Sequence, residues 1–337
     1  MTDTAPAAAD TTSPTRTHRF TRSLKRYPIV QAAALVVVFL IGVLTLDGFG
    51  TGRSITNILI TASFLGIAAA GQTLVALVGG IDMSIGAVIS ASAILTSYLY
   101  GGLGWPDVAV FSFVLVFALL LGAANGYIGQ RFGANPLIVT LGSGFVAVGL
   151  AQVISGGGSD SVKAPEWLGM LSRPVSTTFG LPVPPIVVIW IALIVIVMVM
   201  LTSTPFGKRI YATGASANAA RLALISVRWV WVLVFGLSSV LAAFAGILLA
   251  GFAGSGNTTL GDPYLFLGLA AVIVGGTTLD GRGDYLRTAL AALLLVVVQT
   301  ILVGFGFTNA DRQIIFGLLL LVAVAGYIRQ PRLRDLI

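Results

Sequence analysis

The sequence contains no cysteine and a single histidine, His18, in a polar N-terminal stretch. It therefore has no disulfide, no thiolate metal ligand and no thiol nucleophile, and one histidine cannot form a metal-binding cluster. Charged residues are scarce as well, at 9% of the chain against about 25% in soluble domains. The apolar runs contain no carboxylate pair and no nucleophile–base set, so we expect no catalytic residues, no metal and no cofactor.

Apolar residues make up 57% of the 337 residues, and the mean hydropathy is +0.99. A globule with so little charge could not cover its surface with polar groups, whereas lipid removes that requirement. The 41 glycines suit helices that pack closely in a bilayer. The net charge of +7 comes from basic residues beside apolar runs, which indicates topology and no nucleic-acid partner. The composition predicts a polytopic membrane protein.

Apolar runs of roughly membrane length predict an all-α fold with about ten transmembrane helices. Residues 28–330 would form this membrane domain, between a disordered basic tail at 1–27 and a short tail at 331–337. The first run is too long for the apolar region of a signal peptide, so we take it as an uncleaved span. The predicted spans are Ile29–Leu46, Asn57–Val78, Ser84–Tyr98, Val108–Gln130, Pro136–Ile154, Pro185–Leu201, Val230–Ala250, Tyr264–Val274, Leu286–Val303 and Ile314–Ile328.

The basic residues give the orientation of these spans. With the N-terminus inside and ten alternating spans, fifteen of the 19 Lys and Arg residues lie on the inner side. Only Arg53, Lys163, Arg173 and Arg312 lie outside. Basic residues concentrate on the cytoplasmic side of membrane proteins, and an odd number of spans would destroy this bias. We therefore expect both termini in the cytoplasm.

Two of the predicted loops are long. The outer loop, residues 155–184, is a docking or lid element or a plain connector. The inner loop, residues 202–228, contains the Ala-rich segment ANAARLAL after Gly214, which predicts a short, amphipathic, basic helix. Ser216 or Asn218 would stand near its start. Such a helix lies against the membrane, enters a partner's groove, or serves as an interfacial linker.

A carboxylate interrupts the apolar sequence between the second and third predicted spans, in LVGGIDMSIGAVI (residues 77–89). Asp82 is costly at such a place, so it marks a functional position or a constrained turn. Gly79 and Gly80 would let the backbone turn sharply there. The carboxylate would then cap the next helix or contact a transported solute.

Polar side chains within the predicted spans should face the bundle interior or a cavity, because facing lipid costs free energy. Amides and hydroxyls there can pass an uncharged, hydroxyl-rich solute along weak, replaceable hydrogen bonds, or can simply bond one helix to another. The candidate pathway residues are Gln72, Asp82, Ser84, Asn125, Asn135, Thr140, Ser143, Gln152 and Gln299.

Four sequence blocks, in order, resemble the membrane permease subunit of ABC importers of the ribose/xylose/galactose type. GQTLVALVGGIDMSIGAVIS (71–90) resembles the family's GGIDLSVG block, and NPLIVTLGSGFVAVGLAQVISGG (135–157) resembles its "pfIvTLg" block. TPFGKRIYATGASANAARLALISV (204–227) resembles its cytoplasmic loop, and LAAVIVGGTTLDGRGDY (269–285) its glycine-rich block near the end. The chain departs from the pattern where Leu224 precedes Ile225 in place of a glycine, where Asn218 stands late in the loop, and where LDGRGD replaces a plain Gly-Gly turn.

The resemblance implies a pore for a monosaccharide in the bacterial inner membrane. It implies three partners: a separate ATP-binding subunit, a periplasmic or lipoprotein sugar-binding protein, and a second permease copy, identical or not. The sequence agrees, because its only Gly-Lys pair, Gly207–Lys208, lacks the rest of a phosphate-binding loop. The resemblance also implies that the helix from about Gly214 to Ile225 is the coupling helix that docks on the ATPase. Its named residues are Gly214, Ser216, Asn218, Ala219, Ala220 and Arg221.

Other interpretations stay open on the sequence. The same architecture can carry a nucleoside, an autoinducer or a branched-chain amino acid. An ion-coupled secondary transporter acting alone would need charged residues deep in several spans, and here only Asp82 stands at a span end. The segments VGGIDMSIG (78–86) and VGGTTLDGRG (274–283) look alike, but both follow spans that end inside, so they establish no inverted repeat.

Overall fold

The structure is a computed structural model, and it describes residues 28–157 and 162–328. The predicted tails at 1–27 and 331–337 lie outside the described residues, and so does His18. In the described part the chain is almost entirely helical, and its only β features are two isolated bridges, Thr178–Leu181 and Thr278–Arg282. The helical character expected from the apolar runs is confirmed.

Seven helices in the described part are long and apolar enough to cross a membrane. They are α3 (Gly52–Leu77), α4 (Ile85–Ser97) continued by the π-helical turn η1 (Tyr98–Gly102), α5 (Asp107–Phe132), α6 (Pro136–Ile154), α8 (Pro185–Ser203), α11 (Val227–Ala253) and α13 (Tyr285–Gly304). Two apolar helices are shorter, α2 (Ile29–Thr45) and α12 (Asp262–Val274). The others are α7 (Glu166–Met170), α9 (Pro205–Ala215), α10 (Ala217–Leu222) and α14 (Asn309–Ile328). Every predicted span overlaps a helix, which confirms a polytopic membrane protein, while the count of ten stays a prediction.

Several helix ends follow local sequence signals. Thr51 begins α3, because its hydroxyl accepts a hydrogen bond from the Ser54 backbone N–H at 3.4 Å. Asn135 begins α6 in the same way, and the proline that follows it occupies the first helical turn. Helix α5 ends at Gly133, whose φ of +62° is a left-handed conformation that glycine adopts without strain. These signals are local, so the sequence alone locates them.

Helices α3 and α11 form the centre of the bundle. In their most apolar segments 89% of the residues of α3 and 67% of those of α11 are buried, as are 72% of those of α4 with η1, against 22% in α5 and in α6 and 28% in α8. Small residues let the backbones meet: a Cβ on Gly122 of α5 would lie 2.3 Å from the Phe235 carbonyl oxygen of α11, and one on Gly126 would lie 2.6 Å from that of Trp231. This Gly-x-x-x-Gly spacing is typical of close helix contacts in membranes.

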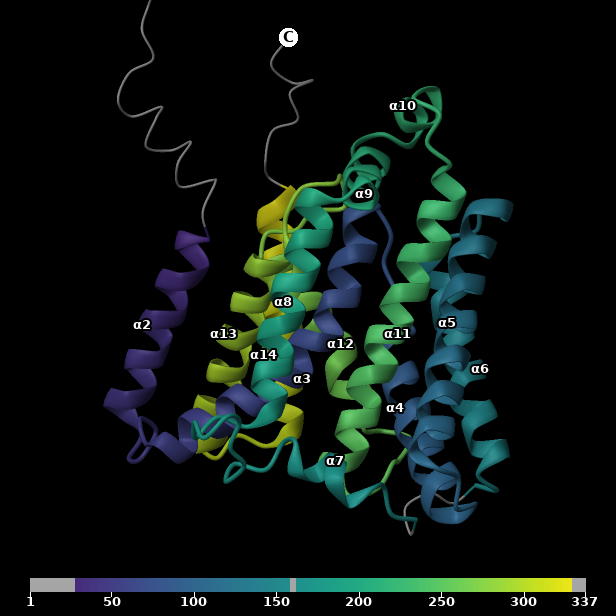
Figure 1. The fold of residues 1–337 in the computed structure, drawn as a ribbon. Coiled ribbons are helices and arrows are strands. Elements are labelled where there is room, and N and C mark those ends of the chain that lie inside the picture. The colour runs from purple at the N-terminus through teal and green to yellow at the C-terminus, as the bar shows by residue number, and fades with distance from the viewer. Residues whose placement is uncertain (1–27, 158–161, 329–337) are drawn as a thin grey trace, which may run out of the picture.

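The two ends of the bundle carry different short helices. Helices α9 and α10 lie at one end, and α7 lies at the opposite end (Figure 1). Helix α2 stands at the edge of the bundle, where the Gln31 side-chain amide donates a hydrogen bond to the Gly275 carbonyl oxygen at 3.0 Å. At the α7 end, the Trp167 indole N–H donates to Asp107 at 2.9 Å and ties the long 155–184 loop to α5. The docking or lid role of that loop stays a prediction.

Candidate functional site

The break between α3 and α4 is a tight turn inside the bundle. Helix α3 ends at Leu77, and Gly79 has a φ of +85°, a conformation that a residue with a side chain adopts only with strain. Helix α4 begins at Ile85, and the Ser84 carbonyl oxygen accepts its first hydrogen bond from the Val88 N–H at 2.8 Å. The expected sharp turn at the two glycines is therefore present, and it presents Asp82 to the interior.

Asp82 is fully buried and accepts three hydrogen bonds. One carboxylate oxygen accepts from the Ser84 backbone N–H at 2.9 Å and from the Ser84 hydroxyl at 2.5 Å. The other accepts from the Ser238 hydroxyl of α11 at 2.9 Å. A buried carboxylate is costly unless donors surround it, and these three donors satisfy it. In this conformation the carboxylate holds the turn ahead of α4 and presents no exposed surface to a solute.

Two further helices join this group, which we call the Asp82 cluster: Asp82, Ser84, Asn125, Thr140 and Ser238. The Thr140 hydroxyl of α6 accepts from the Met83 backbone N–H at 2.9 Å. The Asn125 amide of α5 points at the Ser84 hydroxyl at 3.5 Å, the outer limit of a hydrogen bond. The cluster thus links the α3–α4 turn to α5, α6 and α11, all through buried polar groups.

The other predicted pathway residues lie apart from this cluster. Asn135 caps α6, where its side chain accepts from the Leu137 N–H at 3.0 Å, and Ser143 donates to the Thr140 carbonyl oxygen at 3.0 Å. Gln72 is buried in α3, and its side-chain oxygen has no hydrogen-bond partner among the described residues. Gln152 is exposed near the end of α6. Ser238, by contrast, belongs to the cluster and was not predicted, because a serine within an apolar helix gives no signal of its partner.

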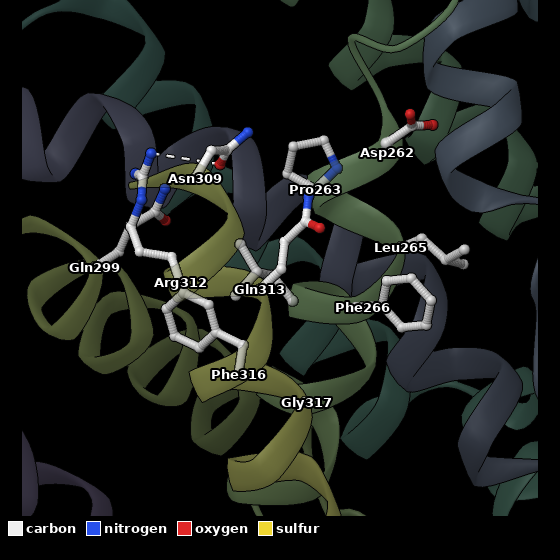
Figure 2. Close-up of a pocket in the computed structure, with 11 residues that line it drawn as sticks. Asp262, Pro263, Leu265, Phe266, Gln299, Asn309, Arg312, Gln313, Phe316 and Gly317 are labelled. Carbon is white, nitrogen blue, oxygen red and sulfur yellow. Dashed lines mark hydrogen bonds between the residues drawn. The ribbon is translucent and has the colours of Figure 1, made fainter. Parts of the chain in front are cut away.

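Gln299 lies in a different place, a cavity of about 520 Å³ between α12, α13 and α14. Figure 2 shows Gln299, Asn309 and Arg312 together at one end of this cavity and Asp262 at the other. None of the polar residues from α12 and α14 was predicted as a pathway residue. In the sequence Arg312 lies beside an apolar run, where an arginine indicates the orientation of the spans and nothing about a cavity. The lining residues are Asp262, Pro263, Leu265, Phe266, Leu267, Gln299, Asn309, Arg312, Gln313, Phe316 and Gly317.

The inner loop forms two helices where one was predicted. The Ala-rich helix α10 begins at Ala217, as the sequence predicts, whereas Gly214, where the resemblance implied the start of the coupling helix, lies in the last turn of α9. Ser216 separates the two helices, and its hydroxyl accepts from the Ala219 N–H at 3.2 Å, which makes it the N-cap of α10. Asn218 instead accepts a hydrogen bond from the Arg221 guanidinium at 3.3 Å on the exposed face. Ala220 is buried, and Ala219 is exposed.

The end of α9 contacts both glycine-containing turns of the bundle. A Cβ on Gly214 would lie 1.9 Å from the Leu77 carbonyl oxygen and 2.8 Å from the Gly281 Cα. The Tyr211 hydroxyl donates to the Gly283 carbonyl oxygen at 3.0 Å. A Cβ on Gly79 would lie 3.1 Å from the Leu279 carbonyl oxygen. We call this contact the glycine junction; the two similar segments of the sequence meet at it, and it connects the inner loop to the turn that holds Asp82.

The exposed tip of the inner loop carries two apolar side chains beside Arg221. Leu222 is 87% exposed and Leu224 is 94% exposed. Leu224 also has a φ of +59°, a left-handed conformation that costs a residue with a side chain about 1–2 kcal/mol. This is the position at which the family pattern has glycine, so the conformation explains the pattern. An exposed leucine in this conformation contributes little to this chain's own packing.

The comparisons with known proteins agree with these features. The sequence matches the family described as "Branched-chain amino acid transport system / permease component" over residues 54–324. It is 30% identical to the autoinducer 2 import system permease protein LsrD of Photorhabdus luminescens over 305 residues, 87% of this chain and 89% of that protein. It is 31% identical to the ribose import permease protein RbsC of Haemophilus influenzae, over 89% of this chain and 93% of that protein.

The similarity extends to a further relative and to one solved structure. The inner membrane ABC transporter permease protein YjfF of Escherichia coli is 30% identical over 86% of this chain and 88% of its own length. A solved inward-facing structure assigned to the metal-chelate type of ABC transporter covers 90% of this chain and 98% of its own, with a TM-score of 0.47 and 16% identity. The structural likeness carries no argument about mechanism at that level.

Proposed function

Because this chain belongs to the family of branched-chain amino acid transport system permease components, we propose that it moves a monosaccharide across the inner membrane as the pore of an ATP-driven importer. Its membership of the ABC importer permeases of the sugar and autoinducer type, and its place in the inner membrane, follow from its relatives and its apolar helices. What we propose beyond this is the identity of the solute, the arrangement of the spans and the partners of the chain.

A neutral solute is supported by the scarcity of charge within the spans. Asp82 is fully occupied by three donors, so it leaves no free charge for an ion or an ionic solute. Apart from Asp82, the buried polar side chains of the described residues are hydroxyls and amides, which suit solutes rich in hydroxyl groups. The ribose permease relative favours a pentose or hexose. The relatives named for autoinducer 2 make that signal molecule the second candidate.

The power for transport comes from a separate ATP-binding subunit in this proposal. The sequence contains no phosphate-binding loop, whereas the inner loop offers Arg221 and the exposed Leu222 and Leu224 as a docking surface. Movement of α9 would reach the α3–α4 turn and the α12–α13 turn through the glycine junction, because its backbone contacts leave no room for independent motion. A solute-binding protein would deliver the solute at the α7 end.

The spans and their assembly complete the proposal. Ten helices cross the membrane, with both termini on the cytoplasmic side, because only then do fifteen of the 19 basic residues lie inside. Two copies of the permease, or this chain and a related one, form the pore between them.

Uptake by the reconstituted complex tests the proposed function. Proteoliposomes that contain this chain, its ATP-binding subunit and its solute-binding protein should accumulate labelled ribose, xylose or galactose only with ATP. Uptake of autoinducer 2, a nucleoside or leucine with no pentose or hexose would overturn the choice of solute. Uptake by this chain alone from a proton or sodium gradient would overturn the ATP-driven mechanism.

A matched pair of substitutions tests the docking surface. Leu224→Asp places a charge on the exposed tip of the inner loop, whereas Leu181→Asp does so on an exposed leucine of the 155–184 loop. Because neither leucine packs in the core, both variants should fold. We expect the ATP-binding subunit to co-purify with the Leu181→Asp variant and to be lost from the Leu224→Asp variant. Equal recovery with both would place the docking surface elsewhere.

A further inference from the structure

We propose that the cavity between α12, α13 and α14 is a binding site for one neutral polyhydroxy solute within the permease itself. This inference rests on the proposed function and deepens it by naming where the solute binds. The cavity has a volume of about 520 Å³, within the roughly 300–1,000 Å³ of small-molecule sites. It is separate from the Asp82 cluster, whose members do not line it.

A group of polar side chains lines part of a cavity whose wall is otherwise apolar. Two of the eleven lining residues are charged and three more carry an amide. A hydroxyl group both donates and accepts a hydrogen bond, and amide, guanidinium and carboxylate groups together provide both functions. They come from three consecutive helices and line the same cavity (Figure 2). These residues are Asp262, Gln299, Asn309, Arg312 and Gln313.

Arg312 is oriented but not neutralised. Its guanidinium donates to the Asn309 side chain and to the Thr308 carbonyl oxygen, both at 3.3 Å. The neighbouring Asp311 does not pair with it, because that carboxylate accepts from the Thr308 N–H at 2.8 Å and from the Thr308 hydroxyl at 2.7 Å at the start of α14. The two ion pairs found in the described part of the chain involve other arginines. The remaining guanidinium N–H groups are thus available to a ligand.

The charges of the cavity favour a neutral ligand. Asp262 and Arg312 carry opposite charges and lie at opposite ends of the cavity (Figure 2), so their sum is zero and neither neutralises the other directly. A ligand with a net negative charge would meet Asp262, and one with a net positive charge would meet Arg312, each at a cost. A zwitterion avoids that cost, and leucine is the probe that tests it. A polyhydroxy compound can accept from the guanidinium at one end and donate to the carboxylate at the other.

The remaining wall is apolar and partly open. Phe316 is 8% exposed and packs in the wall, and Phe266 is 58% exposed at the rim. Such rings offer a flat apolar surface to the C–H face of a sugar ring. Gly317 leaves room beside them, since a Cβ added there would meet no atom within 4 Å. The combination of amides, one charge of each sign and aromatic rings assigns the site to a small carbohydrate.

Cysteine protection tests the site directly, because the sequence has no cysteine of its own. Gln313→Cys and Gly317→Cys each place one thiol on the cavity, and Asn57→Cys places one on the exposed first turns of α3 as a control. The assembled complex, in nanodiscs of phosphatidylcholine, is labelled with a maleimide with and without sugar. At ten times its dissociation constant, a bound sugar should slow labelling of the cavity thiols about tenfold and leave the control unchanged.

The panel of probes separates the possible ligands. Ribose, xylose and galactose are the uncharged probes. Ribose 5-phosphate, an anion, and leucine, a zwitterion with no net charge, are the probes that carry charges. Protection by a neutral sugar and none by the charged probes supports the proposal. Protection by ribose 5-phosphate alone, protection only when anionic phosphatidylglycerol replaces part of the lipid, or equal labelling under all conditions would each overturn it.

Transport kinetics separate failure of the site from failure of the proposed function. Arg312→Gln should raise the KM for sugar uptake about tenfold or more, as expected from loss of a charge-assisted hydrogen bond. Arg53→Gln, on an exposed arginine outside the cavity, should leave KM unchanged. If the unmodified complex imports no neutral sugar, the proposed function fails. If it imports sugar and the Arg312→Gln variant has an unchanged KM, only the site assignment fails.

Discussion

Replacing Ser238 by alanine tests the Asp82 cluster while leaving the carboxylate and its backbone turn in place. The Ser238 hydroxyl donates to Asp82 at 2.9 Å, and both residues are fully buried. Without the Ser238 hydroxyl, one carboxylate oxygen of Asp82 loses its donor, and because the site is buried no water can replace it. Hydrogen bonds to charged groups contribute about 1.5–3 kcal/mol, so we expect Ser238→Ala to lower the free energy of unfolding by that amount.

The adjacent serine provides a matched control. Ser239 is also fully buried on α11, but its hydroxyl has no hydrogen-bond partner among the described residues. Ser239→Ala removes the same atom from the same helix and takes away an unsatisfied polar group. Its effect on the free energy of unfolding should therefore be below about 1 kcal/mol or favourable. The difference between the two variants measures the contact with Asp82 and not the loss of a hydroxyl in general.

Thermal unfolding in one detergent, followed by far-UV circular dichroism, measures both variants. In a chain of this size each kcal/mol shifts Tm by about 2 °C. We expect Tm to fall by about 3–6 °C in Ser238→Ala and not to fall in Ser239→Ala. Equal shifts in the two variants, or no shift in Ser238→Ala, would refute the assignment of Asp82 as a satisfied carboxylate that joins α11 to the α3–α4 turn.

Three further predictions concern the inner loop. Gly214→Ala would place a Cβ 1.9 Å from the Leu77 carbonyl oxygen, so it should lower the free energy of unfolding, measured by thermal unfolding, by about 1–3 kcal/mol. It should also reduce solute uptake more than ATP hydrolysis. Gly52→Ala is the control, because no atom lies within 4 Å of its Cβ, and it should change neither stability nor uptake. Leu224→Gly should raise the free energy of unfolding of the isolated permease by up to about 1 kcal/mol, because it removes the strain of a leucine in the left-handed conformation. The same variant should reduce co-purification of the ATP-binding subunit. A fall in both stability and co-purification would contradict this explanation. Tyr211→Phe should cost about 1 kcal/mol through loss of its hydrogen bond to Gly283. Burial first, and then the negative charge of Asp284, raise the pKa of the Tyr211 phenol above its ordinary value of about 10. The stability that this group contributes is therefore constant below about pH 10 and declines as the pH rises further. Stability that increased above about pH 10 would contradict this assignment.

Much of the helical framework could be predicted because its signals are local. Each predicted span overlaps a helix, since an apolar run of membrane length can satisfy its backbone only by forming one. The turn at Gly79 and the short helix after Ser216 follow from residues within a few positions of each other. The separate helix α9 ahead of it was not predicted; Gly214 lies in its last turn, where the missing side chain leaves room for the Leu77 carbonyl oxygen.

The candidate site could likewise be predicted from the sequence only in part. The sequence singled out Asp82 as a costly group, and it left open whether the carboxylate caps a helix or touches a solute. The structure supplies Ser238, 156 positions away, and with it a buried environment that favours the structural role in this conformation. Arg312 and Asp262 were invisible as members of one cavity, because they are 50 positions apart and each stands at the start of a different helix.

By itself the sequence determined that this chain is a membrane protein with several spans, that it contains no phosphate-binding-loop motif, and that Asp82 is a costly carboxylate within its apolar sequence. Those properties depend on composition, hydropathy and spacing within one segment, which are independent of the partners that each helix finds. Only the tertiary structure decided that the inner loop reaches both glycine-containing turns, that Asp82 is bound to α11, and that polar groups of three helices enclose a cavity. The physical reason is that packing brings distant residues together through shape, and a glycine, a serine or an arginine has no sequence signal for the neighbour it will contact.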